Sequence, residues 1–118
     1  MVSKSKIKKL RQRLEGERER LEQHITHIQD TLRSEDREIG SGEDDADIAA
    51  RAISYNGLMT LLESEEETLA EVEDALQAMD DGSYGICITC GQEIGFARLE
   101  ARPYARRCIT CQEHNSRH

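Results

Sequence analysis

The sequence is poor in aromatic residues: it contains no tryptophan, one phenylalanine and three tyrosines among 118 residues. Charged residues make up 34% of the chain, nearly as much as the 36% that is hydrophobic. Such a composition cannot fill a large globular core, and it is typical of an elongated helical protein with a narrow apolar seam. The chain also lacks a hydrophobic run of membrane-spanning length. Its first residues are basic rather than apolar, so we expect no secretory signal peptide and a cytoplasmic location.

The net charge of −8 is unevenly distributed along the chain. Residues 1–34 have a balance of +4, residues 35–81 a balance of −14 and residues 82–118 a balance of +2. Phosphate contacts need clustered Lys and Arg, so the acidic middle argues against a zinc-ribbon protein that binds nucleic acid, and specific DNA binding is not expected. The basic cluster at the N-terminus is interpreted as a solvated helix face or a complement to the acidic segment; it comprises Lys4, Lys6, Lys8, Lys9, Arg11 and Arg13.

All four cysteines lie in two Cys-x-x-Cys knuckles, Cys87–Cys90 and Cys108–Cys111, separated by seventeen residues. Two knuckles at this separation predict one tetrahedral zinc site. Gly91 follows the first knuckle, where the backbone needs a tight turn. Four thiolates complete the coordination shell and leave no position for an activated water, so we expect one structural Zn²⁺ ion and no catalytic metal. His114 and His118 lie in the terminal tail and are not expected to bind zinc while four cysteines are present.

Three other uses of the cysteines are two disulfides, a thioredoxin-like redox pair and an iron–sulfur cluster. The missing signal peptide favours a reducing compartment, where such a pattern indicates metal binding rather than disulfides. A redox pair leaves the second knuckle unexplained. The alternative function is a zinc and thiol redox-sensing switch, in which thiolate oxidation releases the metal and loosens the structure around it.

Two long amphipathic helices are predicted before the cysteines. Residues 4–34 form the first, with an apolar seam of Ile7, Leu10, Leu14, Leu21, Ile25, Ile28 and Leu32. The pattern breaks over residues 35–43. A second helix then starts, and Ser41 with Asp44 three residues later fits a capping box for it. That helix runs to about Asp81, with Gly82 at its C-cap. Its heptad-like seam contains Tyr55, Leu58, Leu62, Glu65, Leu69, Val72, Leu76 and Met79, of which only Glu65 is charged.

These elements predict an all-α dominated fold: a long antiparallel coiled-coil helical hairpin with a small C-terminal four-cysteine zinc-finger module. The hairpin covers residues 1–82, with an acidic tip near residues 36–48, and the module covers residues 83–118. The seams are expected to hold the hairpin together within a monomer, and the alternative is that they also form a dimeric bundle. His24 and His27 lie beside the seam and are interpreted as polar flanks. On residue physics alone, the acids of the tip serve as N-terminal charges of the second helix.

The chain resembles the DksA/TraR family of bacterial transcription regulators. The resemblance rests on the segment from Tyr84 through Cys87-Ile88-Thr89-Cys90-Gly91 and on through Arg98-Leu99-Glu100-Ala101-Arg102-Pro103 to Cys108 and Cys111. It also rests on the Asp-x-x-Asp-x-Ala pattern met by Asp44, Asp47 and Ala49. With the helical seams, it covers most of residues 4–112. The N-terminal segment is shorter than in the longer members.

The resemblance implies a protein that binds bacterial RNA polymerase directly, without binding promoter DNA specifically. The hairpin of such a protein enters the secondary channel of the polymerase and alters initiation. Asp47 and Ala49 match the tip positions on which the activity depends, and Asp44 matches the companion acid. No nucleophile–base arrangement or phosphate-binding loop is present in the sequence, so we do not expect an enzyme.

The resemblance also raises the question of guanosine tetraphosphate, with which many members act. Arg102 matches one basic position and is the candidate nucleotide-effector contact. The other two basic positions are occupied by Glu71 and Gln112. Glu71 repels a polyanion and Gln112 contributes no charge, so nucleotide binding of the usual form is not expected.

Overall fold

A computed structural model describes residues 2–38 and 45–116, which form four helices. Helix α1 spans Lys4–Glu38 and α2 spans Asp45–Asp81, and both precede the cysteines. The shorter helices α3 (Phe96–Ala101) and α4 (Ile109–Ser116) follow. The described residues contain one isolated antiparallel bridge, Ile86 with Glu93, and no extended strand. This architecture confirms the all-α dominated fold. Within the described ranges, every helix is too short or too polar to cross a membrane.

The chain divides into two compact units. One comprises residues 20–69, and the other comprises residues 1–19 together with residues 70–118. Both ends of the chain therefore contribute to the unit that contains the cysteines. The domain boundary expected after residue 82 stays a prediction.

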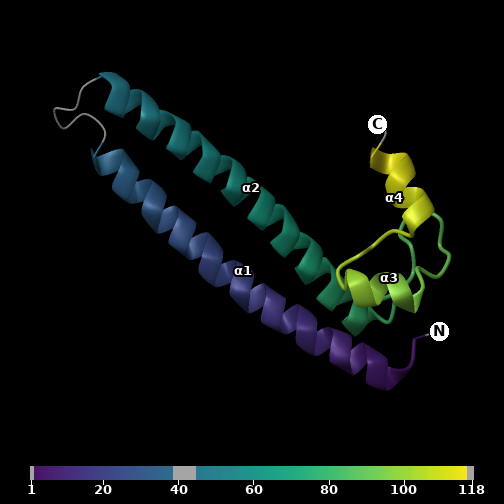
Figure 1. Ribbon diagram of the computed structural model, residues 1–118. Coiled ribbons are helices and arrows are strands. Elements are labelled where there is room, and N and C mark those ends of the chain that lie inside the picture. The colour runs from purple at the N-terminus through teal and green to yellow at the C-terminus, as the bar shows by residue number, and fades with distance from the viewer. Residues whose placement is uncertain (1, 39–44, 117–118) are drawn as a thin grey trace. The chain divides into compact units, whose positions relative to one another are not determined.

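In the unit of residues 20–69, α1 and α2 run antiparallel (Figure 1). Its core consists of Ile25, Ile28, Leu32 and Leu62, with Tyr55, Leu58, Met59 and Leu69 packed against it. These residues confirm the predicted seams and add Met59. Burial of the facing apolar stripes is the main stabilising contribution to such a helix pair.

A polar contact crosses the seam in the same unit. Glu65, the charged residue of the α2 seam, lies with its Oε1 atom 3.4 Å from Nδ1 of His24. The side chain of Glu65 is 17% exposed and that of His24 is 39% exposed. The sequence predicts His24 as a polar flank, and the structure shows that it faces the charged position of the opposite helix.

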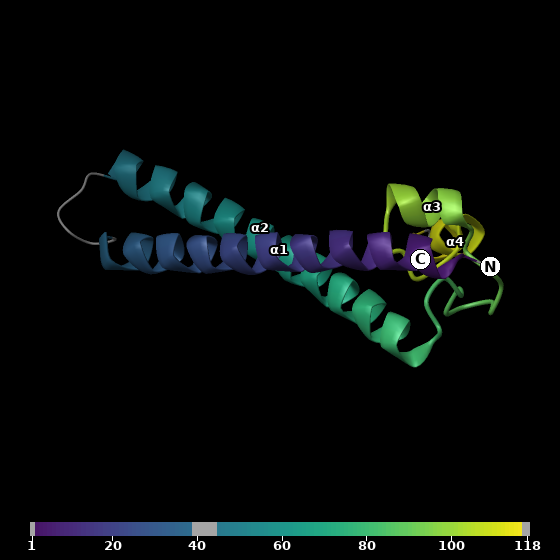
Figure 2. The same cartoon turned by 90° about the horizontal axis from the view of Figure 1, so that it is seen from below.

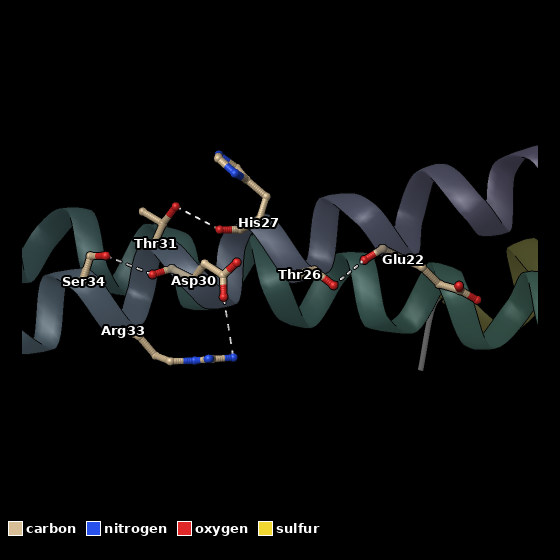
Figure 3. Close-up of polar contacts among 7 residues, drawn as sticks. All are labelled: Glu22, Thr26, His27, Asp30, Thr31, Arg33 and Ser34. Carbon is tan, nitrogen blue, oxygen red and sulfur yellow. Dashed lines mark hydrogen bonds and ion pairs between the residues drawn. The ribbon is translucent and has the colours of Figure 1, made fainter.

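Helix α1 continues four residues beyond the predicted end at Ser34. The predicted end is wrong, because the Ser34 hydroxyl donates to the carbonyl oxygen of Asp30 at 3.2 Å, within the helix (Figure 3). The hydroxyls of Thr26 and Thr31 likewise donate to carbonyl oxygens four residues earlier. The acceptors are Glu22 at 3.0 Å and His27 at 2.9 Å. Hydroxyls bonded in this way fit inside a helix instead of ending it. The capping box predicted at Ser41 and Asp44 lies outside the described residues.

The unit of residues 1–19 and 70–118 has its own core. Its buried residues are Leu10 and Leu14 of α1, Val72, Ala75, Leu76 and Ala78 of α2, Cys87, Leu99 and Ala105. The two alanines of α2 were not predicted, because small side chains do not stand out in an apolar periodicity. They widen the buried face of α2 beyond a narrow seam.

Side chains of α1 also connect to the C-terminal part of this unit. Lys6 Nζ lies 4.3 Å from the centre of the Phe96 ring in α3. Arg11 pairs with Asp80, and Arg13 Nη1 donates to the carbonyl oxygen of Glu100 at 2.8 Å. Figure 2 shows α3 beside the N-terminal part of α1.

Helix α2 ends at a Schellman cap. Gly82 has a φ of 80°, and the amide of Ser83 donates to the carbonyl oxygen of Ala78 at 2.9 Å. This is a bond of that motif, and a left-handed glycine allows it without Cβ strain. The predicted C-cap at Gly82 is confirmed.

Candidate metal centre

The first knuckle is a tight loop closed by backbone hydrogen bonds. The Ile86–Glu93 bridge closes it, and the amide of Cys87 donates to the carbonyl oxygen of Gln92 at 2.8 Å. The amide of Gly91 donates back to the carbonyl oxygen of Cys87 at 3.0 Å. Gly91 has a φ of 75°, in the left-handed region that favours glycine. The turn predicted after the first knuckle is therefore present.

The second knuckle lies at the start of α4. Cys108 precedes the helix and Cys111 lies in its first turn, and the amide of Gln112 donates to the carbonyl oxygen of Cys108 at 2.9 Å. The two knuckles are connected because the amide of Ile88 donates to the carbonyl oxygen of Arg106 at 2.9 Å. One loop and one helix start thus hold the two pairs of thiols in place.

The four predicted metal ligands converge. The sulfur atoms of Cys87, Cys90, Cys108 and Cys111 all lie within 4.8 Å of one another. The sulfurs of Cys90 and Cys108 are 3.9 Å apart. Tetrahedral zinc with four thiolates places neighbouring sulfurs about 3.8 Å apart, so the cluster fits one zinc ion. Four sulfur ligands leave no open coordination position, which fits a structural ion.

The thiols differ in how readily they give up a proton. Burial disfavours the thiolate of Cys87, yet hydrogen bonds from the backbone of Cys108, Cys90 and Thr89 lower the pKa of Cys87 to about 6. Hydrogen bonding with the Cys108 sulfur, and then burial, raise the pKa of Cys111 to about 12. Zinc binding replaces the thiol protons and releases them, and backbone amides aimed at Cys87 stabilise the thiolate that zinc requires.

Residues next to the knuckles hold this part of the unit together. Tyr84 donates its hydroxyl to the carbonyl oxygen of Pro103 at 2.7 Å, and Leu99 is fully buried. Gly85 has a φ of 88°, and a Cβ at this position would lie 3.6 Å from a methyl group of Leu99. Burial raises the pKa of Tyr84 to about 12, although Arg13 and Arg106 act in the opposite direction.

The predicted tip residues are only partly described. Asp44 lies outside the described residues. Asp47 is in the first turn of α2, but its side chain is not among those described. Ala49 lies in the following turn and is exposed. A role for these three residues therefore remains a prediction.

The predicted effector residue Arg102 does lie near the two other positions named with it. Arg102 Nη2 is 3.8 Å from Glu71 Oε2, and Gln112 lines the same pocket. Sequence reasoning missed that Arg98, Arg106 and Arg107 line this pocket too. The signal was present, because four of the five arginines after residue 81 fall between positions 98 and 107.

Comparison with known proteins places this geometry in a family. Residues 82–116 match the family model for the prokaryotic dksA/traR C4-type zinc finger. The fold matches the structure of transcription factor DksA2 from Pseudomonas aeruginosa with a TM-score of 0.80 and 31% identity, over 98% of this chain and 89% of that one. The chain belongs to the DksA/TraR family.

Two other relatives match this chain over only part of their own length. The RNA polymerase-binding transcription factor DksA of Escherichia coli (strain K12) is 33% identical over 95 residues, or 80% of this chain. The chain spans only 58% of the length of that relative. General stress protein 16O of Bacillus subtilis (strain 168) is 53% identical over 53 residues, which are 45% of this chain and 32% of that protein.

Proposed function

We propose that this protein binds bacterial RNA polymerase directly and regulates transcription initiation. The observation that carries the proposal is the structural similarity to DksA2, with a TM-score of 0.80 over 98% of this chain. The E. coli relative is named as an RNA polymerase-binding transcription factor. In this proposal the acidic tip enters the secondary channel, and Asp44, Asp47 and Ala49 act near the polymerase active site.

The cysteine cluster has a structural part in this function. Four thiolates close around one metal ion and offer no site for catalysis, so we infer a regulator and not an enzyme. Zinc bound there connects the two knuckles of the unit that also holds both ends of the chain. We further infer a cytoplasmic monomer that does not bind DNA specifically or use guanosine tetraphosphate in the usual form.

The test is binding to purified bacterial core RNA polymerase, with a cleavage or crosslinking probe attached at the tip. We expect association, with probe products close to the polymerase active site. Failure to bind at micromolar protein would contradict the proposal that this chain binds RNA polymerase as its relatives are named to do.

The tip role is tested with Asp47→Asn, which removes one negative charge and keeps the shape of the side chain. We expect an unchanged thermal midpoint, unchanged binding and loss of the effect on transcription in vitro. A variant with full regulatory effect would contradict the tip role, and the carboxylate would then serve the helix N-terminus alone.

A second candidate function is a thiol redox switch, favoured by the exposure of Cys90 at the otherwise half-buried or buried cluster. An accessible thiolate is the one that an oxidant reaches first. Mild peroxide treatment of the zinc-loaded protein should then release zinc and change its affinity for polymerase. Retention of zinc and of affinity would leave the cluster with a structural role only.

A further inference from the structure

A pocket of about 330 Å³ lies between α2, the first knuckle, α3 and the segment before the second knuckle. We call it the arginine pocket, because Arg98, Arg102, Arg106 and Arg107 line it. All of its lining residues belong to the unit of residues 1–19 and 70–118. In a chain with a net charge of −8, this concentration of guanidinium groups creates a local site that attracts anions.

Two of these arginines are held in place by hydrogen bonds through Nε. Arg98 Nε donates to the carbonyl oxygen of Arg107 at 2.9 Å, and Arg107 Nε donates to Oγ1 of Thr89 at 3.1 Å. Both arginines are half-buried. Because these bonds use Nε, the two Nη groups at the end of each guanidinium can still bind a ligand. Their spacing matches the two oxygens of a carboxylate. These guanidinium groups are therefore oriented before any ligand arrives.

Two acidic side chains also line the pocket. Glu71 and Asp74 of α2 line it, and Glu71 Oε2 lies 3.8 Å from Arg102 Nη2. A polyphosphate would bring several negative charges close to these two carboxylates and would be repelled by them. A single carboxylate carries one charge, so Glu71 and Asp74 repel it less than they repel a polyphosphate. The charges therefore favour a singly charged anion.

Apolar and aromatic groups complete the lining. Ile88 is 55% exposed and lines the pocket, and the Arg102 guanidinium lies 5.1 Å from the centre of the Tyr104 ring. Arginine and tyrosine are enriched among the residues that dominate binding at protein interfaces. An exposed isoleucine beside them offers apolar contact to the neighbour of an acidic residue. This combination suits a peptide segment better than a small free anion.

We propose that the arginine pocket binds a glutamate or aspartate side chain of a protein partner, together with an adjacent apolar side chain. Arg98 and Arg107 hold the carboxylate, and Ile88 contacts the apolar neighbour. Glu71 and Asp74 set the specificity by excluding polyanions. This contact lies in a different part of the chain from the acidic tip and does not depend on the proposed polymerase function.

The experiment is an NMR titration of the zinc-loaded full chain with the capped peptide acetyl-Leu-Glu-Leu-amide. We expect saturable shifts of the Nε–H signals of Arg98 and Arg107 and of the Ile88 amide. The matched peptide with glutamine in place of glutamate should bind about tenfold more weakly, because it loses the charge-assisted hydrogen bonds. Inorganic triphosphate, the second probe, should bind more weakly than the glutamate peptide.

Two variants and one control complete the design. Arg107→Gln should lower the affinity for the glutamate peptide about tenfold. The control Arg33→Gln, in the other unit, should leave that affinity unchanged. Because Arg107 also contacts the first knuckle, zinc content and the thermal midpoint are checked for each variant. Glu71→Gln changes a half-exposed side chain and should strengthen triphosphate binding by a larger factor than peptide binding.

Three results would each overturn the proposal. The first is equal affinity for the glutamate and glutamine peptides. The second is tighter binding of triphosphate than of the glutamate peptide to the wild-type protein, which would make the pocket a polyphosphate site. The third is the absence of saturable shifts at the lining residues at about 10 mM peptide, since even a weak specific contact is measurable there.

Discussion

Tyr84 joins two distant segments of the cysteine-containing unit through a single hydrogen bond. Its hydroxyl reaches the carbonyl oxygen of Pro103, nineteen positions along the chain, at 2.7 Å. That bond connects the segment before the first knuckle to the segment before the second. The half-buried ring keeps the phenol neutral, and burial raises the pKa of Tyr84 to about 12.

Tyr84→Phe should lower the free energy of unfolding of the zinc-loaded protein by about 1 kcal/mol at neutral pH, because the carbonyl of Pro103 loses its donor. The phenol pKa is higher in the folded than in the unfolded chain. Its stabilising contribution is therefore complete below about pH 10 and is lost as the pH rises towards about 12. Urea unfolding of both proteins measures this, and a difference that stayed constant across that range would contradict the assignment.

Two glycines with open space around them should respond oppositely to alanine. Gly91 has a φ of 75° in the first knuckle, whereas Gly16 lies inside α1, and neither has an atom within 4 Å of an added Cβ. Gly91→Ala should destabilise the protein by about 1–2 kcal/mol through left-handed strain. Gly16→Ala should stabilise it by up to about 1 kcal/mol. Denaturant midpoints in excess zinc compare the two, and equal effects would show that backbone conformation is not the cause.

At the scale of the helices, apolar periodicity located both long elements and most of their buried residues. It failed where the deciding interaction was not apolar. Ser34 continues α1 because its hydroxyl bonds within the helix, and the pattern gives no sign of that bond. Ala75 is buried without contributing much to a hydrophobic stripe. The contact of His24 with Glu65 required knowledge of which positions face one another across the two helices.

The seam of the unit of residues 20–69 can be tested with two leucines of that unit. Leu21 is 1% exposed and Leu61 is 38% exposed. Leu21→Ala should lower the free energy of unfolding by about 2–5 kcal/mol, because it removes buried contacts and leaves a cavity. Leu61→Ala should change it by no more than about 1 kcal/mol. Thermal or urea unfolding gives both values, and similar losses would show that Leu61 is buried in solution by a contact absent from this structure.

At the scale of the whole chain, the cysteine spacing was the most informative signal. Four thiols in two identical knuckles predicted the cluster that the structure contains. The arginine pocket could not be predicted in the same way, since its hydrogen bonds join residues nine and eighteen positions apart with no repeating pattern. The tip residues rest on the family resemblance, because acidic residues at a helix start have an ordinary electrostatic explanation.

Removal of zinc should unfold the cysteine-containing module and leave the helix pair of residues 20–69 largely intact. Structural zinc contributes on the order of 10 kcal/mol to small domains, which is more than the short helices α3 and α4 can replace. Hydrogen exchange after chelation should show loss of amide protection at the knuckles and at Leu99, with protection retained at Ile28 and Leu62. Cys87→Ser should reproduce the pattern. Full protection of the knuckles without zinc would contradict the metal-dependent fold.

The pairing of residues 1–19 with residues 70–118 has a consequence during synthesis on the ribosome. The segment of residues 20–69 contains both of its own helical parts, so it can pair before translation is complete. The other unit must wait, because Arg11 needs Asp80, Arg13 needs Glu100, and the fourth cysteine is residue 111. Residues 1–19 are therefore synthesised well before the partners in residues 70–118 with which they pack. Complete zinc capture then requires synthesis as far as residue 111, and zinc shortage would leave residues 1–19 without their folded partners.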